Sequence, residues 1–220
     1  MAHQALIEKR PILLASLAAA LVFYLSRFTG FPELWMIPVK GAACALLALY
    51  ALLHRQGRDG WLLVAMMAVA ALGDVAIEIE LFAAVLLFFI YHAIAISLYL
   101  RHPREHLTPT QKAAAVAMLL LTPLLGWLLP ADRTLAWPLL LYAVALGGMA
   151  ACAWASAFPR YRVGIGAVLF LASDLLLFAG QGPLMGQALP AALIWPLYYV
   201  GQLLITIGVT QTLHRKTHAA

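Results

Sequence analysis

Eight apolar stretches, each separated from the next by a short polar gap, constrain this chain of 220 residues more than any other feature. Each stretch has the roughly 17–25 residues that an α-helix needs to cross a bilayer. Helix-breaking residues such as Pro32, Gly57, Pro103 and Pro159 fall in the gaps, where helices are expected to end. We therefore predict an all-α polytopic membrane bundle of eight transmembrane helices, forming a single domain over residues 1–220. The predicted spans are about 11–28, 35–53, 61–78, 82–100, 112–129, 135–157, 163–180 and 189–212.

The composition excludes a soluble globular domain. Hydrophobic residues make up 65% of the chain and charged residues only 10%, whereas soluble domains carry about 25% charged residues. The net charge of +5 does not indicate nucleic-acid binding, because the basic residues lie in short gaps rather than along one face. Cys44 and Cys152 both fall in apolar stretches, which favours small buried hydrophobic residues over a disulfide or a metal site. The first apolar stretch runs to Phe28, too long for a signal peptide, so we expect a retained helix.

The basic residues are distributed unequally between the two ends of the predicted helices. One side carries eleven of them: Lys9, Arg10, Arg55, Arg58, Arg101, Arg104, Lys112, Arg160, Arg162, Arg215 and Lys216. The other side carries Arg27 and Arg133, together with Glu33, Glu78, Glu80 and Asp132. Because loops rich in lysine and arginine stay in the cytoplasm, both termini are predicted to be cytoplasmic. The expected location is the cytoplasmic (inner) membrane of a bacterium.

Two aspartates, Asp74 in ALGDVAI and Asp174 in FLASDLLLF, lie deep inside apolar stretches. A carboxylate at membrane depth costs roughly 2.5–3.5 kcal/mol on insertion scales, so it usually has a function. Lys40, His92 and Gln202 lie at similar depths in three other stretches. At about 1.5 Å per helical residue, all five lie roughly 13–21 Å from the cytoplasmic end. A shared depth in five helices predicts a polar cavity.

Each of these residues also has a structural interpretation. Asp74 and Lys40 could form an ion pair that serves packing alone, and Asp174 could be a carboxyl group hydrogen-bonded to a neighbouring helix. Lys40 could instead present its ammonium to a substrate phosphate. A single histidine in an apolar helix, such as His92, is often a core residue. Glu78 shares a helical face with Asp74 but lies near the outer surface, as an ordinary loop-end carboxylate would.

Tyr198, Tyr199 and Gln202 are spaced so that they can line one face of the last helix. Several other chemistries have no support in the sequence. There is no GxSxG motif for a serine nucleophile, and no HExxH or CxxC motif for a zinc site. The Gly73–Asp74 pair lacks the other elements of the intramembrane aspartyl proteases. No metal and no cofactor are predicted.

Five short motifs follow one another along the chain: PVK at 38–40, LGD at 72–74, F-x-x-YH ending at His92, GAVLFLASD at 166–174 and LYYVGQLL at 197–204. Taken in this order, they resemble the motifs of the YhhN-like lysoplasmalogenase family of integral membrane proteins. The resemblance covers nearly the whole chain. It implies a membrane hydrolase that cleaves the vinyl ether bond of lysoplasmalogens to a fatty aldehyde and glycerophosphoethanolamine or glycerophosphocholine. It also implies that Asp74 and Asp174 are the catalytic pair.

The polar residues suit this chemistry. Protonation of the β-carbon of a vinyl ether gives an oxocarbenium ion that water attacks, which requires one protonated carboxyl group and one carboxylate. Glycosidases use such a pair for the same kind of ion, and two nearby buried carboxyl groups tend to share one proton. We expect Asp74 and Asp174 to act as acid and base in either order. The expected substrate-binding residues are Lys40, His92, Tyr198, Tyr199 and Gln202.

The partners expected from the sequence are the bilayer and a membrane lysophospholipid substrate, without nucleic acid; the oligomeric state stays open. The alternative function is a small proton-coupled membrane transporter that uses the buried Asp and His layer as a proton relay. Transporters of this kind have helices broken by Gly or Pro in corresponding halves, whereas the two Asp-bearing stretches contain no internal proline. A membrane scaffold would leave the polar layer unexplained.

Overall fold

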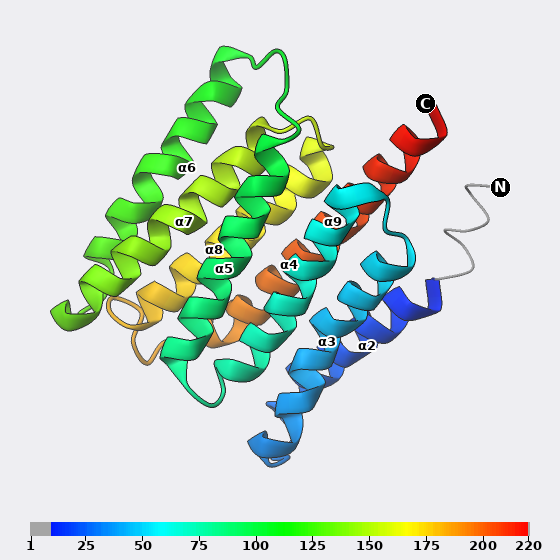
Figure 1. Cartoon of the computed structure of the whole chain (residues 1–220). Coiled ribbons are helices and arrows are strands. Elements are labelled where there is room, and N and C mark those ends of the chain that lie inside the picture. The colour runs from blue at the N-terminus through cyan, green and yellow to red at the C-terminus, as the bar shows by residue number, and fades with distance from the viewer. Residues whose placement is uncertain (1–9, 220) are drawn as a thin grey trace. The chain divides into compact units, whose positions relative to one another are not determined.

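The computed structural model describes residues 10–219, which form eight α-helices (Figure 1). An isolated bridge between Pro103 and Ser156 is the only extended pairing within this part of the chain. The all-α prediction is therefore confirmed. The helices are α2 (Arg10–Ser26), α3 (Glu33–Leu53), α4 (Gly57–Ala76), α5 (Leu81–Leu100), α6 (Pro109–Leu128), α7 (Ala136–Ala155), α8 (Ile165–Gly180) and α9 (Ala188–Ala219). A 3₁₀ turn, η1 (Arg133–Leu135), precedes α7, and a π-helical turn, η2 (Arg160–Gly164), precedes α8.

Seven of these helices, α3 to α9, are long and apolar enough to cross a membrane, and α2 is a shorter apolar helix of 17 residues. Two helices extend well beyond their predicted spans. Helix α4 begins at Gly57 rather than near residue 61, and α9 continues to Ala219 rather than ending near 212. Hydropathy detects only the apolar part of a helix, whereas the hydrogen-bonded backbone continues into its polar flanks. The first turn of α4 includes Asp59, whose charge is favourable near a helix N-terminus.

The chain divides into two compact units, and α5 and α9 each contribute to both. The described part of the first unit comprises residues 10–91 and 213–219, and the second unit comprises residues 92–212. A single domain over the whole chain stays a prediction.

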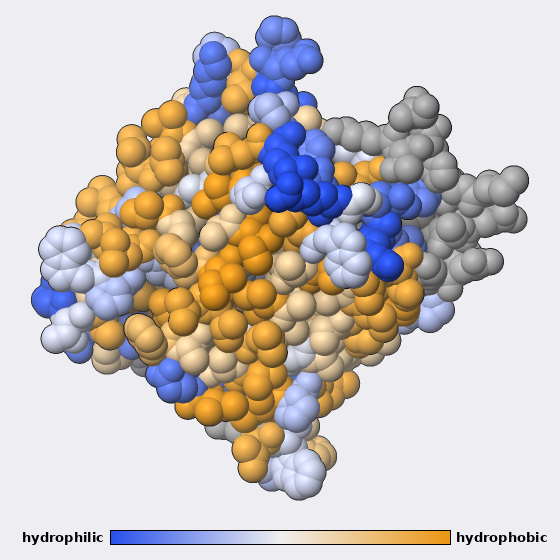
Figure 2. All heavy atoms as spheres, viewed as in Figure 1, coloured by the Kyte–Doolittle hydropathy of each residue, from blue (hydrophilic) through white to orange (hydrophobic). Residues whose placement is uncertain are grey.

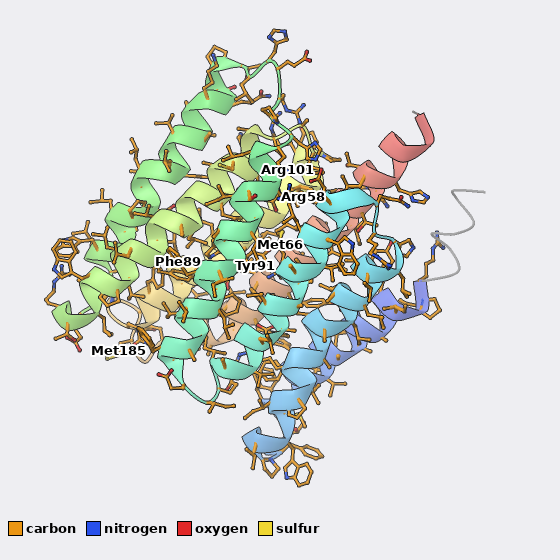
Figure 3. The ribbon with its side chains drawn as sticks, viewed as in Figure 1. Arg58, Met66, Phe89, Tyr91, Arg101 and Met185 are labelled. Atoms are coloured by element: carbon orange, nitrogen blue, oxygen red, sulfur yellow. The ribbon has the colours of Figure 1, made fainter. Side chains whose placement is uncertain are left out.

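The helices of the first unit approach each other closely at small residues. Ser16 of α2 donates a 2.7 Å hydrogen bond to the carbonyl of Ala43 in α3. A Cβ atom added to Gly41 would lie 2.6 Å from the Val75 side chain, so α3 and α4 pack closely only because this residue is glycine. In Figure 1, α2, α3 and α4 lie side by side. Met66 and Tyr91, labelled in Figure 3, are fully buried in this unit.

The second unit is also packed through glycines. Gly147 of α7 lies against the backbone of Met118 in α6, where a Cβ atom would be only 2.6 Å from the Met118 carbonyl oxygen. Gly166 of α8 and Gly201 of α9 face each other's backbones in the same manner. Close backbone approach at small residues is the usual way in which helices associate in a membrane.

Large apolar side chains lie on the outside of the helices in both units. Leu120, Leu141 and Leu72 are all more than half exposed, and Figure 2 shows hydrophobic residues over most of the visible face. Contiguous exposed apolar surface of this kind is unfavourable in water and suits contact with lipid. The chain is thus an integral, multi-pass membrane protein.

Candidate active site

Three buried polar side chains from three helices of the second unit form a hydrogen-bonded chain. The hydroxyl of Tyr142 in α7 donates a 2.7 Å hydrogen bond to Oδ2 of Asp174 in α8. Nε2 of His92 in α5 lies 3.1 Å from the same hydroxyl. All three residues are buried, and His92 is completely enclosed. The chain therefore joins α5, α7 and α8 through polar groups in an apolar interior.

The direction of these hydrogen bonds follows from the number of protons available. A tyrosine hydroxyl has one proton, and in this chain it is donated to Asp174. The contact with His92 must then be donated by the imidazole N–H at Nε2 to the tyrosine oxygen. Donation runs from His92 through Tyr142 to Asp174. A hydrogen-bond chain of this kind holds the carboxyl group of Asp174 in one orientation.

Only one oxygen of Asp174 is engaged in this chain. Within residues 10–219, Oδ2 accepts the bond from Tyr142, and Oδ1 neither receives a hydrogen bond nor is fully enclosed. Oδ1 can therefore accept a proton or a hydrogen bond from a water molecule or a substrate.

Aromatic side chains surround this hydrogen-bonded chain. The ring of Phe170 lies 5.1 Å from that of His92 and 5.1 Å from that of Tyr198. Trp195 continues the cluster, with its ring 5.7 Å from Tyr198 and 6.1 Å from Tyr199. Phe170 therefore links the histidine end of the hydrogen-bonded chain to the aromatic side chains of α9.

The residues selected by sequence on α9 lie in the same unit. Tyr198, Tyr199 and Gln202 are buried, and Gln202 is completely so. The carbonyl of Gln202 accepts a 2.8 Å hydrogen bond from the hydroxyl of Thr206 one turn later. Ser173, beside Asp174, donates a 2.9 Å hydrogen bond to the carbonyl of Ile194 and so ties α8 to α9. Tyr198 is the α9 residue that reaches the aromatic cluster next to His92.

The other two sequence-selected residues, Asp74 and Lys40, lie in the first unit. Asp74 of α4 is buried, with only 2% of its surface exposed. The preceding residue, Gly73, lies against the ring of Phe88, and a Cβ atom there would be 2.9 Å from that ring. Asp74 therefore occupies a position where α4 packs tightly against α5.

Lys40 forms a salt bridge with Glu78, four residues beyond Asp74. Its ammonium also lies 5.2 Å from the ring centroid of Phe23 in α2. The sequence had suggested Asp74 as the partner in an ion pair with Lys40. Glu78 follows the end of α4, and its side chain, 34% exposed, pairs with Lys40. An ion pair of Lys40 with Asp74 stays a prediction.

Tyr142 is the residue of this site that the sequence analysis did not select. Tyrosines are common at membrane interfaces, so a tyrosine in an apolar stretch gives little signal. Its depth was nevertheless a usable sign. Tyr142 lies six residues into α7, or about 9 Å from the start of the helix.

The described residues include no group of three or more His, Cys, Asp or Glu side chains that could hold a metal ion.

These features define a class: a multi-pass helical membrane protein with a buried carboxyl group held by a histidine–tyrosine chain. Residues 35–209 match the model of the YhhN family, and the chain belongs to this family. A protein from Mycobacterium bovis named lysoplasmalogenase is 30% identical over 178 residues, covering 77% of this chain and 68% of the relative. A protein of the same name from Mycobacterium tuberculosis matches with the same identity and coverage. No solved structure matches the chain.

Proposed function

We propose that this protein is a membrane-embedded hydrolase that cleaves the vinyl ether bond of lysoplasmalogens. The products would be a fatty aldehyde and glycerophosphoethanolamine or glycerophosphocholine. Family membership and the name of the two mycobacterial relatives support the class of reaction. The single structural observation that carries the proposal is the buried Asp174, oriented through one oxygen and open at the other.

The reaction needs two carboxyl groups in opposite protonation states. One donates a proton to the β-carbon of the vinyl ether, and the π electrons of the double bond form the new C–H bond. The resulting oxocarbenium ion is attacked at its α-carbon by water, whose proton passes to the second carboxylate. The hemiacetal then breaks its bond to the glycerol oxygen. The hemiacetal hydroxyl proton returns to the first carboxylate and the second carboxyl group protonates the departing glycerol oxygen, so both groups regain their starting states.

We assign the water-activating carboxylate to Asp174 and the acid to Asp74. Asp174 accepts a hydrogen bond from Tyr142, an arrangement that suits an ionised oxygen better than a protonated one. Its open Oδ1 is suited to receive the proton of the attacking water. Asp74 is buried, with 2% of its surface exposed, and burial favours the neutral form of a carboxyl group, which is the form that the acid requires. Tyr142 and His92 act as positioning residues.

Substrate binding is assigned by the chemistry of the remaining residues. Lys40 is proposed to attract the phosphate as a point charge, in competition with Glu78. Tyr198, Tyr199 and the apolar cluster around Phe170 are proposed to hold the alkenyl chain, and Gln202 the glycerol oxygens. The substrate would enter from the bilayer, in a bacterial cytoplasmic membrane.

The test is an assay of aldehyde release by the full-length protein in detergent. A 1-alkenyl lysophospholipid is compared with the 1-acyl compound of the same chain length and headgroup. We expect aldehyde from the alkenyl compound and no fatty acid from the acyl compound, because the acid protonates a carbon–carbon double bond. Absence of aldehyde release from the folded protein, together with proton uptake into vesicles containing it, would replace the hydrolase with the transporter.

A further inference from the structure

Two arginines of the second unit converge on the turn that joins α7 to η2. Nε and Nη2 of Arg104 donate hydrogen bonds of 3.1 and 3.0 Å to the carbonyls of Ser156 and Phe158. Arg160 donates through Nε to the carbonyl of Trp154 at 3.4 Å, and its guanidinium lies 5.4 Å from the centroid of the Trp154 ring. Both guanidinium groups are therefore held against one five-residue segment.

Among the described residues, no carboxylate neutralises these two charges. Within residues 10–219, neither Arg104 nor Arg160 has an acidic partner within salt-bridge distance. The two guanidiniums are close enough for their positive charges to act on each other. Two half-buried like charges without a counter-charge are unfavourable unless an anion binds between or beside them.

Two enclosed donors at this point also have no acceptor in the described part of the chain. One is Nη2 of Arg160, and the other is Nε1 of Trp154, in the ring against which Arg160 lies. An enclosed N–H without an acceptor costs about 1–3 kcal/mol, more for a charged group. Arg104 uses only two of the five N–H groups of its guanidinium for carbonyls, which leaves three for a ligand.

The local backbone directs Arg160 toward this position. The segment from Arg160 to Gly164 forms a π-helical turn before α8, an arrangement often found at functional sites. Gly164 leaves room for the neighbouring side chains: a Cβ atom there would lie 3.0 Å from Cγ of Arg160 and 3.1 Å from the Trp154 ring. The glycine thus allows the stem of Arg160 to fold back over Trp154.

The position along the membrane spans identifies the kind of anion. Trp154 lies one residue before the end of one candidate span, and Arg160 is the first residue of the next. Tyr161, beside Arg160, is 85% exposed. Trp, Tyr and Arg gathered at a span end are typical of the depth of lipid headgroups.

We propose that Arg104 and Arg160 form a binding site for the phosphate of an anionic phospholipid headgroup. The planar guanidinium groups match the geometry of phosphate oxygens. This site is separate from the proposed hydrolytic site. Arg160 precedes Asp174 by 14 residues, or about 20 Å along the helix, whereas three glycerol carbons separate the vinyl ether and phosphate oxygens of one lysoplasmalogen. The inference therefore does not depend on the proposed function.

The experiment is native mass spectrometry of the full-length protein in an uncharged detergent, with added phosphatidylglycerol. Phosphatidylcholine of the same acyl chains and inorganic phosphate serve as the two other ligands. We expect the protein to retain phosphatidylglycerol, and Arg160→Gln to weaken this retention at least tenfold. Arg160→Lys should weaken this retention less, because lysine keeps the positive charge and lacks only the planar guanidinium group. If Arg160→Gln does not fold, Arg160→Lys still tests the site.

The matched control is Arg58→Gln, which removes the same charge from an exposed arginine of α4 (Figure 3). Equal weakening by Arg58→Gln would overturn the site in favour of a general charge effect. Equal binding of phosphatidylcholine, or displacement of the lipid by inorganic phosphate at similar concentration, would overturn the assignment to an anionic lipid. Unchanged retention by a folded Arg160→Gln variant would reject the site altogether.

Discussion

The hydroxyl of Tyr142 donates a 2.7 Å hydrogen bond to Oδ2 of Asp174, 32 residues later in the chain, and ties α7 to α8 in the interior of the second unit. Because His92 lies on the other side of that hydroxyl, Asp174 is held by a chain of two residues rather than by one contact. Orientation of a carboxyl group by supporting hydrogen bonds is a general requirement of acid–base catalysis. The predictions for Asp174 and Tyr142 follow from this relationship.

Asp174→Asn and Asp74→Asn should each lower the rate of aldehyde release by at least about 10²-fold, since each removes a titrating group while keeping its shape. The double variant should lose far less than the product of the two single losses, because the residues act as a unit. Glu105→Gln, an exposed carboxyl in the 101–108 loop, is the control and should not change the rate. Normal turnover by either folded single variant would remove that aspartate from the mechanism.

Tyr142→Phe should lower kcat by roughly tenfold or more while leaving KM nearly unchanged, because it frees the orientation of Asp174 without touching the substrate. Tyr161→Phe removes a hydroxyl from an exposed tyrosine and serves as the matched control. Steady-state kinetics on both purified variants provide the measurement. A rise in KM at constant kcat would instead place Tyr142 among the substrate contacts.

Lys40→Met should weaken substrate binding at least tenfold if its ammonium attracts the phosphate, and Lys40→Arg should retain part of the affinity. The pair is part-buried, with the Lys40 side chain 11% and the Glu78 side chain 34% exposed. The stability cost of Lys40→Met should therefore lie between the roughly 1 kcal/mol of exposed pairs and the roughly 3–5 kcal/mol of a broken buried pair.

Glu78→Gln is the companion variant for Lys40, because it removes the competing carboxylate. Glu78→Gln should leave the affinity for the substrate unchanged or raise it. Binding assays and thermal melting in detergent would be run on both variants. If both variants melt at equally reduced temperatures and bind substrate normally, Lys40 is structural and is withdrawn from the site.

Gly147→Ala should destabilise the protein, whereas Gly148→Ala should not. A Cβ atom at Gly147 would lie 2.6 Å from the Met118 carbonyl oxygen, while one at Gly148 would make an ordinary 3.5 Å contact with Ile96. Overpacking of this kind costs roughly 1–3 kcal/mol. At Gly148, alanine can raise the stability of the protein by up to about 1 kcal/mol, because alanine has a higher helix propensity than glycine. Thermal melting of the two variants side by side tests the α6–α7 packing, and equal melting temperatures would contradict it.

The topology prediction concerns the loops at the two ends of the helices. In a background of Cys44→Ala and Cys152→Ala, Met185→Cys should react with an impermeant thiol reagent in intact cells, and Glu105→Cys should not. Met185 lies in the 181–187 loop and is 63% exposed, so access does not limit the reaction (Figure 3). The reverse pattern of labelling would place both termini outside the cytoplasm.

Much of the architecture could be predicted because membrane helices are selected by length and hydropathy, which are properties of each segment alone. The eight predicted spans correspond in order to α2–α9, seven of them long enough to cross a membrane. The errors lie at the ends. Helix α9 continues past residue 212 into a polar segment, because hydropathy does not detect a helix that leaves the lipid.

The sequence by itself determined that this chain is a multi-pass helical membrane protein and that Asp174 and His92 are buried in its helices, since apolar length and residue depth can be counted along the chain. The tertiary structure decided which side chains meet. It placed Tyr142 between His92 and Asp174 and brought Glu78 into a salt bridge with Lys40. The physical reason is that rotation of each helix about its axis, and close approach at glycines such as Gly41 and Gly147, depend on packing between helices. That packing brings together residues from separate segments, and a single sequence carries no direct record of it.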